Sequence, residues 1–138
     1  SGLLGISGVS NDLRAVTEAA EEGSDRAMLA YEMYAYSVKK YIGQYMMLMG
    51  GVDCIALAGG VGENSDKMRR MIFAGLQPMG IILDYGKNRK RDRGERVISS
   101  DSSNVLIAVL PTDEEYMIAR DTYQLVHDKS LSESITVL

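Results

Sequence analysis

The sequence predicts an α/β fold in which short strands are packed by helices. Apolar runs of strand length, residues 52–58 and 105–110, alternate with longer segments whose apolar residues recur at helical spacing. This alternation is typical of domains whose strands are buried by helices. The chain has 138 residues, of which 46% are hydrophobic and 25% are charged. It can therefore bury a core, and residues 1–138 are expected to form one unit.

The N-terminal segment predicts a lead-in followed by a helix. Residues 1–10 carry three glycines and three serines among apolar residues, which favours a loop or an extended segment. A helix is expected over residues 12–22, with Leu13, Val16 and Ala20 on one side.

A longer helix is expected after Gly23, with Ser24 as its cap and Gly50 and Gly51 at its end. Its apolar residues recur every three or four positions: Ala27, Tyr31, Tyr34, Val38, Tyr41, Ile42, Tyr45 and Met49. A stripe of tyrosine and methionine can form the wall of a ligand site. Helical periodicity favours a core or a subunit interface instead.

The middle of the chain predicts a strand, a tight turn and a helix. The apolar strand over residues 52–58 leads directly into GGVGEN and then into an amphipathic stretch. Asp66 is expected in the first turn of that helix, where the helix dipole favours a carboxylate. The apolar face of the helix is expected to consist of Met68, Met71, Ile72, Leu76 and Met79.

The last part predicts two more strands and a helix. Residues 80–83 and 105–110 have strand character, and Pro111 stops the second run. The basic run over residues 87–96 is interpreted as a solvated loop, because the interleaved aromatic residues of a nucleic-acid surface are missing. A final helix places Tyr116, Ala119, Tyr123 and Val126 on one face, and residues 129–138 are expected to form a frayed tail.

Composition excludes several classes of protein. The formal net charge of −4 argues against a chain that coats nucleic acid, and no run approaches the ~18 apolar residues of a membrane span. Cys54 is the only cysteine, so it is expected to be a buried apolar residue, and a reducing compartment is favoured. The N-terminus shows no basic region followed by a hydrophobic stretch, so together with the missing membrane-span run a cytoplasmic location is expected. The sequence begins with Ser1 and not with an initiating methionine, so we expect a fragment.

The motif ALAGGVGENSDKMR is the strongest chemical signal. Gly59, Gly60 and Gly62 let the backbone turn sharply and let a flat ligand approach bare backbone at a helix start, which suits a nucleotide. The spacing only approximates a dinucleotide-binding GxGxxG motif, and no GK[ST] of a phosphate-binding loop follows. A glycine-rich turn without a ligand stays open as the alternative.

The motif PTDEEYMIARDT is the second signal. Thr112 and Glu115 have the spacing of a capping box, and Asp113 and Glu114 would lie in the first helical turn. Helix capping thus explains the acidic residues without a function, and metal binding by Glu114 is the alternative. A third segment, GVSNDLR, places polar groups near a helix start and indicates nothing specific alone.

Together these segments resemble the acetate kinase family. SGLLGISGVSNDLR is similar to a block at the start of that family's C-terminal stretch, GGVDCIALAGGVGENSDKMR to its adenosine-binding segment, and VLPTDEEYMIARDT to its closing strand and helix. The resemblance runs over nearly the whole chain. It implies a C-terminal portion of a ribonuclease-H-like fold, in the superfamily of actin-like ATPases.

The resemblance also implies an activity. The family transfers the γ-phosphoryl group of ATP reversibly to acetate, giving acetyl phosphate and ADP with Mg2+, and works as a homodimer. Motif matching implies nucleotide contacts at Asp12, Leu13, Arg14, Gly60, Val61, Gly62, Glu63 and Asn64, and a magnesium-linked glutamate at Glu114. Gly60 and Gly62 are accordingly predicted to lie against the adenosine.

The family's phosphate loop, catalytic aspartate, acetate-site arginines and transition-state histidine belong to earlier sequence that has no counterpart here. No catalytic residue is therefore expected in this chain, and the isolated chain is expected to be inactive, because phosphoryl transfer depends on positioning and charge neutralisation. Propionate kinase and a non-catalytic nucleotide-binding module stay open as alternatives.

Overall fold

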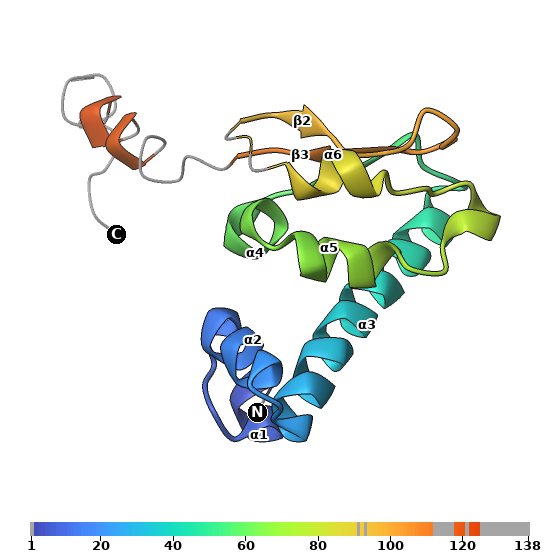
Figure 1. Ribbon diagram of the computed structural model, residues 1–138. Coiled ribbons are helices and arrows are strands. Elements are labelled where there is room, and N and C mark those ends of the chain that lie inside the picture. The colour runs from blue at the N-terminus through green and yellow to red at the C-terminus, as the bar shows by residue number, and fades with distance from the viewer. Residues whose placement is uncertain (1, 91, 93, 112–117, 121, 125–138) are drawn as a thin grey trace, which may run out of the picture.

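The computed structural model describes residues 2–90, 92, 94–111, 118–120 and 122–124. Helices α1 and α2 pack beside the first half of the long helix α3, and the sheet with its short helices lies beyond the other half (Figure 1). The architecture is α/β with a small mixed sheet, as the sequence predicts. Among the described residues no helix is both long and apolar enough to cross a membrane.

Helices α1 (Leu3–Ser7) and α2 (Leu13–Glu21) form the N-terminal end. The expected lead-in over residues 1–10 is wrong where α1 forms, because Leu3 and Ile6 pack against the small cluster of Val16, Ala20, Ala27 and Ala30. Helix α2 begins and ends within a residue of the prediction. Leu13, Val16 and Ala20 are all buried, which confirms its predicted apolar side.

Helix α3 (Asp25–Leu48) begins at its predicted cap, where the Ser24 hydroxyl accepts a hydrogen bond from the Ala27 amide at 3.3 Å. The predicted stripe is buried only at its start. Ala27 and Tyr31 lie in the core, while the side chains of Tyr45 and Met49 are 56% and 69% exposed. The C-terminal half of α3 therefore presents apolar side chains that the described residues leave uncovered.

The sheet contains β1 (Cys54–Leu57), β2 (Arg96–Val97) and β3 (Leu106–Val109) in the order β1-β3-β2. Strands β1 and β3 are parallel, and β2 runs antiparallel to β3. The strand expected over residues 80–83 is reduced to an isolated bridge between Leu83 and Ser99. Strand β2 was not predicted, because it is short and ends the basic run.

The helices α4 (Gly59–Asn64), α5 (Asp66–Phe73) and α6 (Tyr85–Arg89) and the 3-10 turn η1 (Gln77–Met79) complete the described fold. Three expectations are corrected here. The GGVGEN turn is itself a short helix, the basic run begins inside α6 rather than in a loop, and the apolar face of α5 stops at Phe73. Met79 consequently lies outside that helix and is 67% exposed.

The main core fills the space between the sheet and the helices α3 and α5. Its largest fully buried side chains include Phe73, Met68, Ile81, Ile98 and Ile107. Cys54 is exposed, which corrects the expectation of a buried thiol, because β1 lies at the edge of the sheet formed by the described strands and its burial is only partial. The final helix agrees with helical residues at 118–120 and 122–124, whereas the expected tail at 129–138 lies outside the described residues.

Candidate functional site

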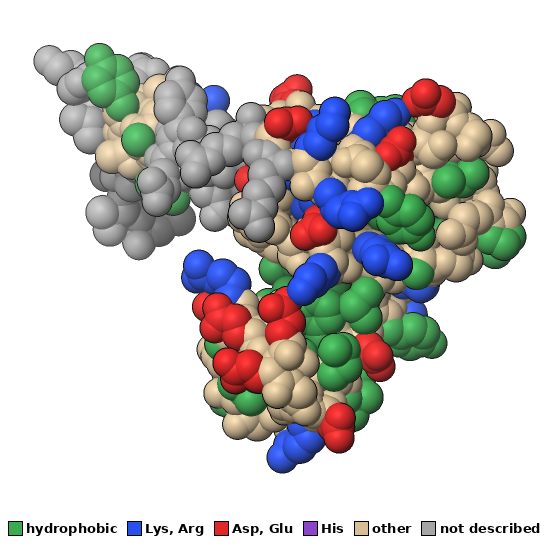
Figure 2. All heavy atoms as spheres, in the orientation of Figure 1, with side chains coloured by type: hydrophobic (Ala, Val, Ile, Leu, Met, Phe, Trp, Pro, Cys, Tyr) green, Lys and Arg blue, Asp and Glu red, His purple; other side chains and the backbone are tan. Residues whose placement is uncertain are grey.

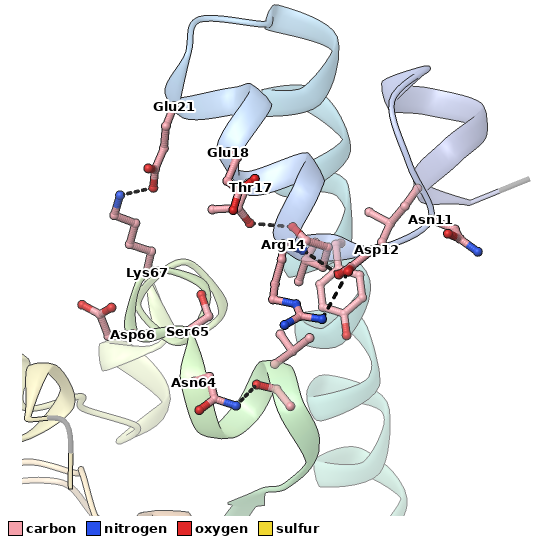
Figure 3. Close-up of a pocket in the computed structure, with 15 residues that line it drawn as sticks. Asn11, Asp12, Arg14, Thr17, Glu18, Glu21, Asn64, Ser65, Asp66 and Lys67 are labelled. Atoms are coloured by element: carbon pink, nitrogen blue, oxygen red, sulfur yellow. Dashed lines mark hydrogen bonds and ion pairs between the residues drawn. The ribbon is translucent and has the colours of Figure 1, made fainter. Parts of the chain in front are cut away.

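A cleft of about 1210 Å³ lies where the start of α2 faces α4 and the start of α5 (Figure 3). Segments distant in sequence form its walls. Its lining residues are Leu3, Asn11, Asp12, Leu13, Arg14, Thr17, Glu18, Glu21, Tyr34, Gly60, Val61, Asn64, Ser65, Asp66 and Lys67. A cleft of this size can hold a small-molecule ligand such as a nucleoside.

The structure brings most of the sequence-predicted site residues to this cleft. They come from two segments, and the cleft-lining ones are Asp12, Leu13, Arg14, Gly60, Val61 and Asn64. Gly62 and Glu63 are not among the lining residues, and their contact with a nucleotide stays a prediction. Glu114 lies outside the described residues.

The wall built by α2 is fixed by its cap. The Asp12 carboxylate accepts a hydrogen bond from the Arg14 amide at 2.9 Å and lies 3.4 Å from the Arg14 guanidinium. The amide hydrogen bond, with help from the guanidinium charge, lowers the pKa of Asp12, so this carboxyl is ionised at neutral pH. The side chain of Arg14 is 90% exposed and thus accessible to a ligand.

The wall built by α4 presents bare backbone and one amide side chain. Gly59 has φ of 75°, a conformation that lets the chain leave β1 and enter α4 at once. An added Cβ at Gly60 would meet nothing within 4 Å, so open space lies beside it. The Asn64 amide donates to the Gly60 carbonyl at 2.9 Å, which holds that side chain along the helix.

The wall built by the start of α5 ties three helices together. The Ser65 hydroxyl caps α5 by accepting from the Met68 amide at 3.1 Å, and it also lies 3.2 Å from the Tyr31 hydroxyl of α3. Lys67 forms an ion pair with Glu21 at the end of α2. The hydrogen bond and the charge of Glu21 raise the pKa of Lys67.

The cleft is more acidic than basic. The carboxylates of Asp12, Glu18, Glu21 and Asp66 line it, against the two cations of Arg14 and Lys67. In Figure 2 acidic side chains gather on the α2 side of the hollow, and basic side chains are concentrated over α5 and α6. An excess of carboxylates disfavours a polyanion and suits the hydroxyl groups and ring of a neutral ligand.

Sequence reasoning missed part of the lining. Thr17, Glu18 and Glu21 follow the predicted segment by one and two helical turns, so helical spacing from Arg14 was the available signal. The pairing of Glu21 with Lys67 joins residues 46 positions apart and has no local signal. No group of three histidine, cysteine or acidic residues suited to a metal ion occurs among the described residues.

Comparison with known proteins assigns this arrangement to a family. The model of the acetokinase family matches residues 1–120. The chain belongs to the acetokinase family. An acetate kinase of Caldanaerobacter subterraneus subsp. tengcongensis is 53% identical over 127 residues, covering 91% of this chain and 31% of that relative. The residues matched by the family model include both cleft-forming segments, 11–21 and 60–67.

Solved structures of the family agree. The crystal structure of Porphyromonas gingivalis acetate kinase superimposes with a TM-score of 0.81 at 48% identity, covering 91% of this chain and 32% of that one. A propionate kinase of Francisella tularensis subsp. tularensis gives a TM-score of 0.74 at 38% identity, with coverage of 86% and 30%. The chain therefore spans about a third of the length of the relatives it matches.

Proposed function

We propose that this chain is the C-terminal, nucleotide-binding part of an acetate kinase. The whole enzyme transfers the γ-phosphoryl group of ATP reversibly to acetate, and this part supplies the adenosine site. One observation carries the proposal: Asp12, Leu13 and Arg14 line the same cleft as Gly60, Val61 and Asn64. The net acidic lining suits the hydroxyl groups and ring of the neutral nucleoside.

The proposal extends to the rest of the assembly. Among the described strands, β1 has no partner on its outer edge. This open edge supports the proposal that the rest of the enzyme adds strands there. The completed sheet would be the ribonuclease-H-like core of the actin-like ATPase superfamily. The exposed apolar residues of α3, including Tyr41, Tyr45 and Met49, support a homodimer interface. A single cysteine, exposed as a free thiol, suits the reducing cytoplasm.

Magnesium enters the proposal through Glu114, which lies outside the described residues. The carboxylates that line the cleft form no metal cluster, since Asp12 caps α2 and Glu21 pairs with Lys67. In phosphotransferases Mg2+ is held by one or two carboxylates together with phosphate oxygens and water, so one glutamate suffices. Such an ion neutralises charge on the phosphates of ATP.

Propionate kinase is the weaker alternative. The solved propionate kinase is 38% identical to this chain, against 48% for the Porphyromonas acetate kinase. The residues that select the acyl group belong to the segments that this chain lacks. A non-catalytic nucleotide-binding module would use the same cleft without the acyl chemistry.

A hybrid enzyme tests the proposal. This chain replaces the matching third of the Caldanaerobacter acetate kinase, and acetyl phosphate formation is followed by trapping with hydroxylamine. We expect the hybrid enzyme to turn over. We expect its Asn64→Ala variant to have a KM for ATP about tenfold higher and an unchanged KM for acetate, since a hydrogen bond to the ligand is worth roughly 1 kcal/mol or more. Lys90→Ala, in the basic run away from the cleft, is the control. A folded hybrid that forms no acetyl phosphate, or an Asn64 variant that changes only the acetate KM, contradicts the proposal.

A further inference from the structure

Helix α4 has little intrinsic stability, although it carries one wall of the cleft. It has six residues, three of them glycine, and its N-cap residue Ala58 offers no side-chain hydrogen bond. An isolated helix this short does not persist in water, and glycine weakens it further. Its position must therefore be set by contacts from other elements.

The carbonyls at the end of α4 are held by a buried guanidinium. Arg69 of α5 is only 2% exposed, and its Nη1 donates to the carbonyls of Gly62 at 2.8 Å and Glu63 at 2.9 Å. Arg96 donates to the same Glu63 carbonyl at 2.8 Å. Cations at a helix C-terminus satisfy its free carbonyls and complement its dipole. Arg69 does not line the cleft but lies behind the wall.

Arg69 is itself positioned by one residue of α6. The Asn88 side-chain oxygen accepts from Arg69 Nε at 2.7 Å, and the Asn88 backbone carbonyl accepts from Arg69 Nη2 at 2.8 Å. Asn88 is 2% exposed, and its amide also donates to the carbonyl of Asp66 at 2.9 Å. Because Asp66 lines the cleft at the start of α5, Asn88 connects α6 to two walls of the site.

The Arg69 guanidinium is buried, so its stability depends on its hydrogen-bond acceptors. Burial, and then the nearby charge of Arg96, lower the pKa of Arg69 from its ordinary value. A buried guanidinium that loses an acceptor keeps the cost of desolvation without compensation, so it moves toward another acceptor or toward water. Any such movement releases the carbonyls of α4.

We propose that Asn88 is a positioning residue of the nucleotide site: it fixes the Arg69 guanidinium, which holds the end of α4 and so sets where Gly60, Val61 and Asn64 face the cleft. This inference rests on the proposed function for the identity of the ligand. The hydrogen bonds by which Arg69 holds the end of α4 exist without any ligand. The positioning of α4 and the binding of the nucleotide are therefore tested separately.

Hydrogen exchange of the 138-residue chain, followed by mass spectrometry, tests the hold on α4. In Asn88→Leu we expect amides of residues 59–64 to exchange about tenfold faster, while those of residues 13–21 keep their rate. Asn88→Asp retains an acceptor for Arg69 Nε and should restore slow exchange. Ile98→Val, a fully buried core position, controls for general loss of stability. Should Asn88→Leu fail to fold, Asn88→Ser replaces it, because the shorter serine side chain also removes the acceptor for Arg69 Nε.

Kinetics of the hybrid enzyme test the consequence for the nucleotide. We expect Asn88→Leu to raise the KM for ATP between about tenfold and hundredfold and to leave the KM for acetate unchanged, because a displacement of about 1 Å suffices for such losses. Lys87→Ala, which removes the contacts of α6 with Ser99 and Asp101 but not those with Arg69, should change neither. Unchanged exchange in α4, or faster exchange with an unchanged KM for ATP, overturns the inference. If the unaltered hybrid binds no nucleotide, the proposed function fails, and the exchange rates still decide whether Asn88 holds α4.

Discussion

Gly60 and Gly62 stand two residues apart in α4 but meet different surroundings. Open space lies beside Gly60, which lines the cleft. A Cβ at Gly62 would lie 3.2 Å from the Leu57 Cβ and 3.3 Å from the Leu57 backbone carbon. Gly62 therefore lets α4 pack closely on β1, and its glycine has a structural reason that the motif alone does not distinguish from ligand contact.

Alanine substitutions separate the two roles. We expect Gly62→Ala to destabilise the chain by about 1–3 kcal/mol, because the strand backbone at Leu57 has little freedom to move away. Gly60→Ala should leave the melting temperature unchanged or slightly higher, since alanine favours a helix, and should weaken ADP binding in the hybrid enzyme. Thermal unfolding and calorimetric titration measure the two effects. Equal melting temperatures for both variants would contradict the assignment of Gly62 to packing.

The residue types that the sequence identified are those with a local signature. Asp12 was expected near a helix start, and its side chain does cap α2. Arg69 and Asn88 carry no such signature, because charged and polar residues in a helix are normally assigned to its solvent face. Their burial depends on contacts 19 residues apart in the chain, which periodicity does not encode.

Among the elements, helix caps were predicted best. Helix α3 begins at its expected cap, where Ser24 accepts a backbone amide of its own helix, and α2 begins one residue after the predicted start, because Asp12 accepts the Arg14 amide as its cap. Helix α4 and strand β2 were missed, since neither is long enough to show a period and each is stabilised by tertiary contacts. The strand predicted at residues 80–83 is only an isolated bridge, because Leu83 alone pairs there, with Ser99.

The cap of α5 differs from the cap of α3 in having a tertiary partner. Ser65 accepts from the Met68 amide and lies 3.2 Å from the Tyr31 hydroxyl, whereas the side chain of Ser24 caps α3 through the Ala27 amide. Serine-to-alanine substitution at either cap should destabilise the chain by about 0.5–2 kcal/mol. Only Ser65 is expected to be coupled to Tyr31.

A double-mutant cycle measures that coupling. We expect Ser65→Ala and Tyr31→Phe to be non-additive by about 0.5–1.5 kcal/mol in urea unfolding, because each removes the same hydrogen bond. The matched cycle of Ser24→Ala with Tyr31→Phe should be additive. Coupling of similar size in both cycles would show that Tyr31 senses α3 stability in general rather than the link between α3 and α5.

At the scale of the whole molecule, the described surface is that of a part. Strand β1 pairs on one side only among the described strands, and its residues alternate between exposed and half-buried. The second half of α3 exposes Tyr41, Tyr45 and Met47. The chain also spans about a third of the length of its relatives. The family resemblance implied that the chain is one part of a longer enzyme, while the particular surfaces left open required the structure.

The isolated chain is expected to form no acetyl phosphate from ATP and acetate. Phosphoryl transfer requires cations that neutralise charge on the transferred group and residues that align the acceptor. The cleft supplies the cations Arg14 and Lys67, of which Lys67 is paired with Glu21, and its carboxylates outnumber them. Purified chain, ATP, magnesium, acetate and hydroxylamine should therefore give no acetyl hydroxamate, while the hybrid enzyme serves as the positive control. Magnesium-dependent turnover by the chain alone, reduced by Arg14→Ala, would show that the described cleft contains the reaction centre and not only the adenosine site.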